Sequence, residues 1–120
     1  MKALVVDDSR TMRTILAKIL RGLDMEVSEA ENGEAALAAL ADEPELVLVD
    51  WNMPVMSGID FVVAARGAEY AYRGRIMLVT AETDADQVVQ ALDAGADEYL
   101  MKPFDPEAVV EKLRLLDVIP

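Results

Sequence analysis

Residues 46–50 read Leu-Val-Leu-Val-Asp, four apolar residues followed by a single acid. The run is too short for a helix, and its composition suits a strand buried on both faces, as in a parallel sheet. Similar runs occur at 3–6 (ALVV) and 76–79 (IMLV). The alternating stretch 25–28 (MEVS) is typical of an edge strand, and 99–101 (YLM) is a short fifth candidate. The sequence therefore predicts five strands.

Helical patterns separate these strands. Apolar residues from Met12 to Leu23 follow i, i+3, i+4, i+7 spacing and predict a helix over 10–21, with Gly22 as its stop. Gly95 is a second expected stop. The remaining helices are predicted from residues suited to cap their N-termini. Asn32 would cap a helix over 33–42, and Ser57 would cap a helix that begins directly after Ser57. Thr83 or Asp84 would cap a helix over 85–94, and Asp105, followed by Pro106, would cap a helix over 106–116. The β-α order, repeated five times, implies a parallel sheet with helices on both faces.

Composition limits the class of protein. The chain has 120 residues, 53% of them hydrophobic, which suffices for the core of one domain over 1–120. It has no cysteine, which excludes disulfides and thiolate metal sites. No apolar run is long enough for a membrane span, and Asp7 and Asp8 interrupt the apolar start before it could serve as a signal peptide. We therefore expect a cytoplasmic protein without membrane insertion.

Charge argues against one class of partner. The net charge is −12, from 23 acidic and 11 basic residues, and such a chain repels phosphate backbones. We expect no direct contact with nucleic acid. Residues 10–21 are the exception, because they contain Arg10, Arg13, Lys18 and Arg21 and no acid. This segment is either an ordinary solvated face or a docking face for an acidic partner, and we favour docking.

Polar residues stand where the apolar runs end. Asp7 and Asp8 follow the first run, Asp50 follows the third, Thr80 follows the fourth and Lys102 follows the fifth. In a parallel sheet these carboxyl ends share one edge, where the ligands of open α/β sheets bind. Polar residues commonly cap buried strands, which accounts for any one of these residues. It accounts poorly for three acids, one hydroxyl and one cation together.

This set of side chains suits phosphoryl transfer. Clustered carboxylates raise one another's pKa unless a cation joins them, and oxygen ligands alone select a hard cation, Mg²⁺ before Ca²⁺. A carboxylate can attack phosphorus to form an acyl phosphate, while a metal, the Lys102 ammonium and the Thr80 hydroxyl spread the charge on the transferring oxygens. Asp50 is the best nucleophile candidate, because it stands alone on its strand.

The whole chain resembles the receiver domains of two-component response regulators. The residues that carry the resemblance are Asp7-Asp8, Asp50, Thr80 and Lys102-Pro103, within the segments 50–54 (DWNMP), 79–82 (VTAE) and 102–104 (KPF). The resemblance implies an α/β, doubly wound, flavodoxin-like (β/α)5 fold with strand order 2-1-3-4-5. It also implies a signalling switch that catalyses only its own phosphorylation and dephosphorylation and is not otherwise an enzyme.

By this resemblance, Asp50 accepts a phosphoryl group from a histidine kinase. Asp8, Asp50 and the backbone carbonyl of Asn52 would ligate Mg²⁺, with Asp7 assisting largely through water. Lys102 would bind a phosphoryl oxygen, and the Lys102–Pro103 bond is cis in this family.

The same resemblance implies how the signal leaves the site. Thr80 would move to hydrogen-bond the phosphoryl group, and Tyr99 would rotate inward behind it, although a half-buried strand aromatic needs no function. Helix 85–94, strand 97–101 and helix 106–116 would then present an altered surface to an output partner. Asn52 and Glu82 would control access of the hydrolytic water.

The resemblance is strongest to family members that act in chemotaxis, which implies that pathway, and we expect a monomer. The alternatives are a phosphorelay intermediate, another single-domain receiver, or a receiver that is never phosphorylated. A small aspartyl phosphatase of the haloacid-dehalogenase kind is less favoured, because Asn52 stands where its second catalytic Asp is needed. A flavodoxin-like FMN binder is disfavoured because Asp7 and Asp8 would repel the phosphate.

Overall fold

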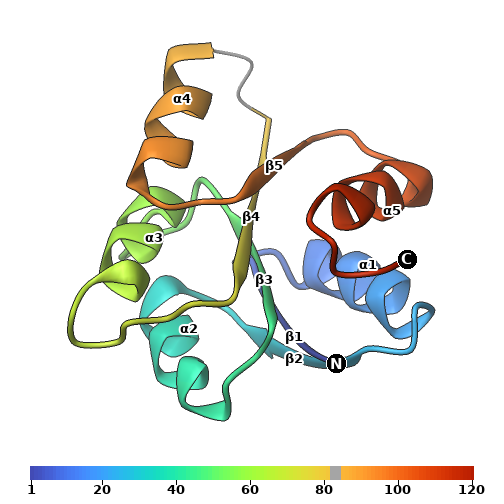
Figure 1. Cartoon of the computed structure of the whole chain (residues 1–120), viewed down its shortest axis with the longest axis horizontal. Helices are drawn as coiled ribbons and strands as arrows, with labels where there is room; N and C mark the ends of the chain where they lie inside the picture. Colours follow the sequence, from blue (N-terminus) through green and yellow to red (C-terminus); the bar gives the residue numbers. More distant parts are fainter. Residues whose placement is uncertain (82–84) are drawn as a thin grey trace.

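The computed structural model describes residues 1–81 and 85–120. Five strands form one parallel sheet in the order β2-β1-β3-β4-β5 (Figure 1). Their bounds are β1 Lys2–Val6, β2 Glu26–Ala30, β3 Leu46–Asp50, β4 Arg75–Thr80 and β5 Glu98–Met101. The doubly wound α/β fold and the predicted strand order are therefore confirmed.

Helices cover both faces of this sheet. Their bounds are α1 Arg10–Arg21, α2 Gly33–Ala39 with a 3-10 turn at Leu40–Asp42, α3 Gly58–Arg66, α4 Ala85–Ala94 and α5 Pro106–Leu115. In Figure 1, α1 and α5 lie on one side of the sheet, and α2, α3 and α4 lie on the other. No helix in the two described ranges combines the length and apolar character that crossing a bilayer requires.

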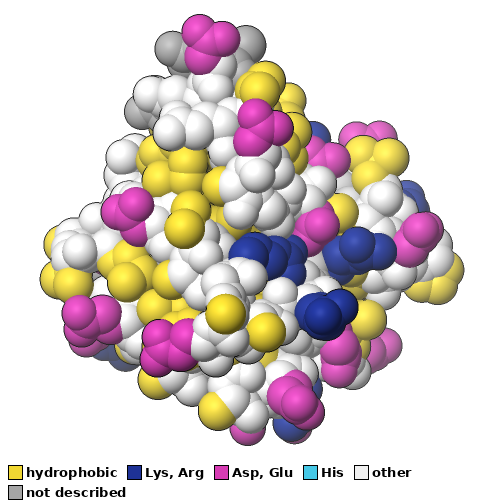
Figure 2. All heavy atoms as spheres, turned by 60° about the vertical axis from the view of Figure 1, so that its left-hand side comes forward, with side chains coloured by type: hydrophobic (Ala, Val, Ile, Leu, Met, Phe, Trp, Pro, Cys, Tyr) yellow, Lys and Arg dark blue, Asp and Glu magenta, His cyan; other side chains and the backbone are white. Residues whose placement is uncertain are grey.

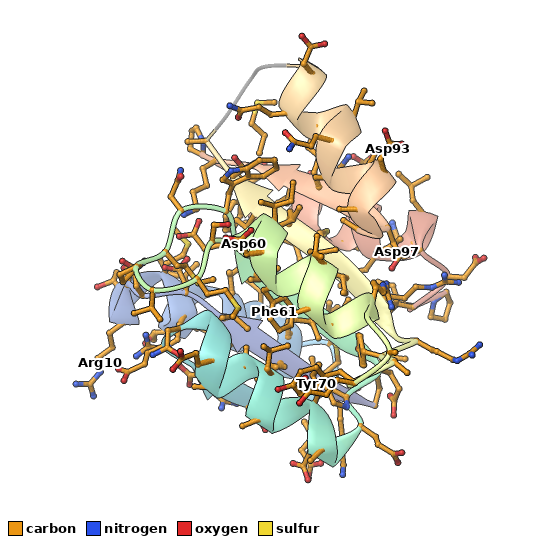
Figure 3. All side chains as sticks on the ribbon, turned by 90° about the vertical axis from the view of Figure 1, so that its left-hand side faces the viewer. Arg10, Asp60, Phe61, Tyr70, Asp93 and Asp97 are labelled. Atoms are coloured by element: carbon orange, nitrogen blue, oxygen red, sulfur yellow. The ribbon has the colours of Figure 1, made fainter. Side chains whose placement is uncertain are left out.

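Each face of the sheet has its own apolar core. Phe61 of α3 points toward the sheet and packs with Leu78 on the α2/α3 side (Figure 3). Leu16 of α1 and Leu113 of α5 pack with Met77 on the other side. Neighbouring residues of β4 thus point to opposite cores, which explains why the strands read as continuous apolar runs.

The predicted caps are present where the structure describes them. The side chains of Asn32, Ser57 and Asp105 each accept a hydrogen bond from the backbone N–H three residues on, at 2.8, 3.2 and 2.8 Å. The expected caps Thr83 and Asp84 lie outside the described residues. The helix expected over 33–42 is α-helical only to Ala39, after which the 3-10 turn tightens the chain.

The strand predicted nearest the sheet edge is wrong in its bounds, whereas the predicted end of the first helix is confirmed. The edge strand predicted at 25–28 runs from Glu26 to Ala30, because parallel pairing with β1 continues as far as Val6 opposite Ala30. Gly22 follows the last residue of α1 as predicted, but its φ is an ordinary −64°, and the left-handed residue of this turn is Asp24, with φ 65°. Gly95 does adopt a positive φ, 122°, as expected of a helix stop.

Arg66 ties the end of α3 to the segment before β4 and to the connection between α4 and β5. Its guanidinium donates to the carbonyl oxygens of Gly95 and Tyr72, at 3.0 and 2.7 Å, and to the Asp97 carboxylate at 2.9 Å. Asp97 also accepts the backbone N–H of Ile76 at 2.8 Å. The C-terminal end of α4 and the start of β5 are thereby fixed against α3.

We expect Arg66→Ala to lower the free energy of unfolding by about 2 kcal/mol, because it removes charge-assisted hydrogen bonds from a partly buried site. Urea denaturation measures the change. Arg73→Ala is the matched control, since Arg73 is exposed and makes no hydrogen bond within the described ranges. Equal stability of the two variants would show that the ties of Arg66 contribute little.

Charge is unevenly spread over the surface. On the face shown in Figure 2, acidic side chains are scattered around the periphery and basic side chains gather toward the middle. Several basic groups on the molecule are paired internally, as Arg66 is with Asp97. Much of the positive charge therefore supports the fold and leaves the surface strongly acidic.

Candidate functional site

The carboxyl ends of four strands bring the predicted site residues to one edge of the sheet. Asp50 ends β3 and Thr80 ends β4, while Asp7 follows β1 and Lys102 follows β5. Asp7, Asp50 and Thr80 are only 1, 6 and 1% exposed. These polar side chains are buried among strand ends, which a structural role alone does not require.

Three carboxylates meet in this site. Oxygen atoms of Asp7, Asp8 and Asp50 all lie within 4.8 Å of one another, and Asp8 is exposed at the opening. One oxygen of Asp7 accepts the N–H of Ser9 at 2.8 Å, but its buried Oδ2 has no hydrogen-bond partner. A buried carboxylate oxygen that accepts no hydrogen bond, beside two further carboxylates, fits a hard cation such as Mg²⁺.

Lys102 supplies positive charge to the cluster. Its Nζ lies 3.1 Å from Oδ1 of Asp50 and 3.7 Å from Oδ2 of Asp7. The peptide bond from Lys102 to Pro103 is cis, as the family resemblance implied. The backbone N–H of Lys102 donates to the carbonyl of Thr80 at 2.8 Å, which joins the ends of β4 and β5.

Burial disfavours the charged form of Asp7. Desolvation is the main cause that raises its pKa above the ordinary value of 3.8. The N–H of Ser9 and the Lys102 ammonium oppose this rise, while the charges of Asp50 and Asp8 add to it. The ionised form of Asp7 therefore destabilises the folded state until a cation compensates its negative charge.

Asp7→Asn should stabilise the protein by about 1 kcal/mol at neutral pH without Mg²⁺. Because the folded-state pKa of Asp7 is raised, the folded state binds more protons than the unfolded state above pH 3.8, so this group lowers the free energy of unfolding as pH rises. The advantage of Asn should therefore grow from pH 3.8 toward neutrality.

Urea denaturation across this pH range measures the effect, with the exposed Asp42→Asn as control. Addition of Mg²⁺ should narrow the difference, since binding to the folded state stabilises the wild type more. A less stable Asp7→Asn protein at neutral pH without Mg²⁺ would contradict the expectation.

Backbone hydrogen bonds hold the chain directly after Asp50 against β4 and α3, and the sequence did not predict these contacts. The N–H of Trp51 donates to Val79 at 3.0 Å, and the N–H of Gly58 donates back to Trp51 at 2.8 Å. A Cβ at Gly58 would collide with the carbonyl oxygen of Asp50 and lie 2.9 Å from Cα of Trp51. Gly58 is thus needed for close approach of α3, whereas the sequence indicated only Ser57, as the cap of this helix.

Arg13 also has a role that the sequence did not reveal. Its guanidinium donates to the backbone carbonyl of Asp7 at 2.6 Å and pairs with Glu29 at 3.3 Å. Arg21 lies 4.0 Å from the same carboxylate. Two of the four cations expected on a docking face thus bind within the chain, whereas Arg10 extends from the start of α1 into solvent (Figure 3). Lys18 is exposed as well.

Two further predicted residues lie in the loop after β3 and on β5. Asn52 is exposed in the loop after β3, and Glu82 lies outside the described residues. Tyr99 is half-buried on β5, opposite Leu78 of β4, while Thr80 stands opposite Met101. Tyr99 and Thr80 therefore project from the same face of the sheet.

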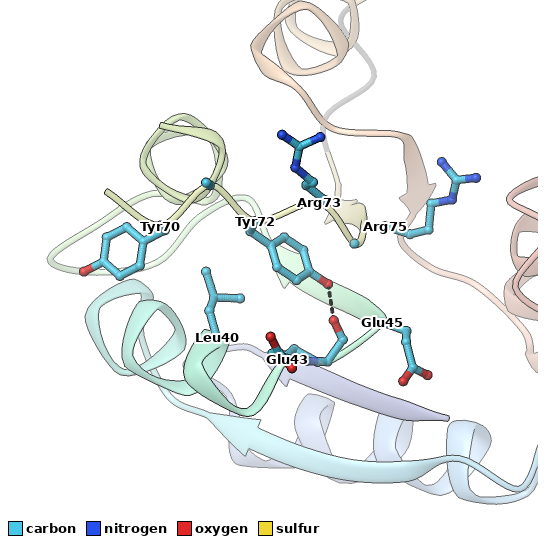
Figure 4. Close-up of a pocket in the computed structure, with 10 residues that line it drawn as sticks. Leu40, Glu43, Glu45, Tyr70, Tyr72, Arg73 and Arg75 are labelled. Carbon is cyan, nitrogen blue, oxygen red and sulfur yellow. Dashed lines mark hydrogen bonds between the residues drawn. The ribbon is translucent and has the colours of Figure 1, made fainter. Parts of the chain in front are cut away.

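A pocket at the opposite edge of the sheet lacks comparable chemistry. Figure 4 shows it between the segments that precede β3 and β4, lined by Leu40, Glu43, Glu45, Tyr70, Tyr72, Arg73 and Arg75. The Tyr72 hydroxyl donates to the carbonyl of Pro44 at 2.7 Å, and burial raises the pKa of Tyr72 to about 12. This tyrosine ties two loops together, and the charges around it are of both signs.

Known proteins share this fold and much of this sequence. Residues 3–114 match the response regulator receiver domain family. The chemotaxis protein CheY of Pseudomonas aeruginosa is 40% identical over 115 residues, 94% of this chain and 93% of that protein. The chemotaxis protein CheY1 of Helicobacter pylori is 42% identical, over 97% of this chain and 96% of that protein.

A solved structure agrees with the sequence relatives. The chemotaxis response regulator CheY4 of Vibrio cholerae superposes with a TM-score of 0.88 at 34% identity, covering 96% of this chain and 97% of that one. The chain therefore belongs to the response regulator receiver domain family. It is a phosphorylation-activated switch of two-component signalling.

Proposed function

We propose that Asp50 is the phosphoacceptor and that the receiver unit extends over residues 1–120. The observation that supports this most is the setting of the Asp50 carboxylate, which is nearly buried, 3.1 Å from the Lys102 ammonium and beside two further carboxylates. A lone structural ion pair would need only one acid. Three carboxylates beside one ammonium leave negative charge uncompensated, which favours binding of a second cation.

Asp8, Asp50 and the backbone carbonyl of Asn52 would hold Mg²⁺, with Asp7 assisting through water. When bound, Mg²⁺ supplies positive charge beside the oxygens of the transferring phosphoryl group. The free oxygen of Asp50 attacks phosphorus, a P–O bond to aspartate forms, and the bond from phosphorus to the donor imidazole or acetate breaks. Lys102 then pairs with one phosphoryl oxygen and Thr80 hydrogen-bonds another.

The chain catalyses only its own phosphorylation and dephosphorylation in this proposal. Loss of the phosphoryl group is hydrolysis of the acyl phosphate, which returns Asp50 as a carboxylate and releases inorganic phosphate. Asn52, two residues after Asp50, and Glu82 would govern access of water to phosphorus. No second Asp follows Asp50 at the position that an aspartyl phosphatase needs.

The pathway we propose is chemotaxis in the cytoplasm, since both sequence relatives above are named chemotaxis proteins. The phosphodonor is a histidine kinase, and a monomer would bind an output protein in its phosphorylated state. Arg10 and Lys18 on α1 would face the kinase, while α4, β5 and α5 would contact the output partner. Val89, Leu92 and Met101 are exposed apolar residues on that second face.

Stoichiometry separates this proposal from the phosphatase alternative. With acetyl phosphate and Mg²⁺, the wild-type chain should incorporate no more than one phosphoryl group, as measured by intact mass. With p-nitrophenyl phosphate it should show little turnover. Rapid multiple turnover of p-nitrophenyl phosphate without stable labelling would favour the phosphatase instead.

A further inference from the structure

A lysine on α5 covers the ring of the proposed switch tyrosine. The Nζ of Lys112 lies 4.2 Å from the centroid of the Tyr99 ring, a cation–π contact. The same ammonium donates to Oε1 of Glu98 at 3.0 Å. Glu98 is held in turn, because its Oε1 accepts the backbone N–H of Tyr99 at 3.0 Å. The three residues form one connected unit across β5 and α5.

The positions of Lys112 and Tyr99 on opposite sides of the sheet indicate where the Tyr99 ring lies. Tyr99 stands opposite Leu78, which belongs to the core on the α3 side of the sheet. Lys112 comes from α5, which packs on the other side through Val109 and Leu113. β5 is the outer strand of the sheet, so the ammonium can meet the ring only around this free edge. The ring therefore leans outward, and within the described residues it packs with neither apolar cluster.

Inward rotation of the ring would break this contact. Thr80 projects from the same sheet face as Tyr99, two positions further along the paired strands. A ring that turns from the outer edge of β5 toward Thr80 moves away from the ammonium of Lys112. The ion pair with Glu98 keeps that ammonium in place, with side chains only 25 and 19% exposed.

We propose that Lys112 is a positioning residue that holds Tyr99 at the outer edge of β5 and so favours the resting state of the switch. The inference rests on the proposed function and on the inward rotation of Tyr99 that the family resemblance implies. A contact present in one of two states biases the equilibrium by the free energy of that contact. Removal of the Lys112 charge makes the activated state easier to reach, without any change at Asp50.

The test is the affinity for beryllofluoride, a phosphoryl mimic, in the presence of Mg²⁺ and monitored by Trp51 fluorescence. Lys112→Met keeps much of the length of the side chain but removes the charge, and we expect it to tighten apparent binding roughly two- to fivefold. Lys112→Arg retains a cation over the ring and should bind the mimic as the wild type does. The probe avoids an output protein, because Lys112 lies on the face proposed to contact it.

Two further measurements show that the effect runs through Tyr99. In a Tyr99→Ala background, Lys112→Met should no longer change the affinity for beryllofluoride. In the free protein, the NMR signals of the Tyr99 ring should shift in Lys112→Met and stay in place in Lys112→Arg. Unchanged affinity in Lys112→Met, or an effect that persists in the Tyr99→Ala background, overturns the proposal.

Asp50→Asn distinguishes this failure from failure of the proposed function. If beryllofluoride binding is lost in Asp50→Asn but unchanged in Lys112→Met, only the role of Lys112 is wrong. If binding persists in Asp50→Asn, the phosphoacceptor itself is misassigned, and the inference about Lys112 falls with it.

Discussion

Asp50→Asn should abolish phosphoryl incorporation from acetyl phosphate. An amide has the size and shape of the carboxylate but no anionic oxygen to attack phosphorus, so the change removes the nucleophile and preserves packing. Asp7 and Asp8 remain close by, yet we expect neither to replace Asp50. Asp7 is committed to the N–H of Ser9, and Asp8 lies at the exposed opening of the site.

Intact mass after incubation with acetyl phosphate and Mg²⁺ measures the effect, and lability to hydroxylamine identifies an acyl phosphate. Asp60→Asn is the matched control, because Asp60 is an exposed aspartate on α3 (Figure 3). It should label as the wild type does. Labelling of Asp50→Asn at full yield would sink the assignment and turn attention to Asp8.

Asp7, Asp50, Thr80 and Lys102 could be placed at one edge of the sheet from the sequence because each stands directly after an apolar run. Burial of the run fixes the strand, and the end of the run fixes the edge at which Asp50 or Thr80 emerges. Local pattern did not order the strands in the sheet, however. The order 2-1-3-4-5 depends on which strands pair across long stretches of chain, and only the family resemblance supplied it.

Contacts between distant side chains escaped the sequence. Arg13 looked like a docking cation, because its charge is visible in the sequence but the carbonyl of Asp7 that it binds is not. The backbone conformation of the turn after α1 was likewise not predictable from the sequence. Glycine is the usual left-handed residue at a helix end, yet here Asp24 adopts that conformation and Gly22 does not.

Gly58 and Lys112 illustrate two kinds of residue whose roles the sequence alone does not reveal. Gly58 is required by the approach of α3 to the backbone of Asp50, a distance that no local motif encodes. Lys112 falls among ordinary helix charges in the sequence, and only the packing of α5 beside β5 brings it over Tyr99. Residues that act by placing others are visible only once the tertiary structure is known.

Lys102→Ala should leave the fold intact but weaken the response of the chain to phosphorylation. The Lys102 ammonium is the cation that reaches both Asp50 and Asp7, and it is only about a quarter exposed. With the phosphoryl group in place, its partner becomes a phosphoryl oxygen, and a charge-assisted hydrogen bond of this kind contributes about 1.5–3 kcal/mol. Beryllofluoride should therefore bind roughly ten- to a hundredfold more weakly.

The same change should uncouple labelling from the output face. Mg²⁺ still offsets the carboxylates, so acetyl phosphate should continue to label Asp50, but without the lysine the end of β5 is no longer drawn toward the phosphoryl group. We expect the NMR signals of Tyr99 to respond little to beryllofluoride, even at saturating concentrations. Lys18→Ala, which removes an exposed lysine on α1, should respond as the wild type does. A full Tyr99 response in Lys102→Ala would mean that Thr80 alone carries the signal from Asp50 to β5.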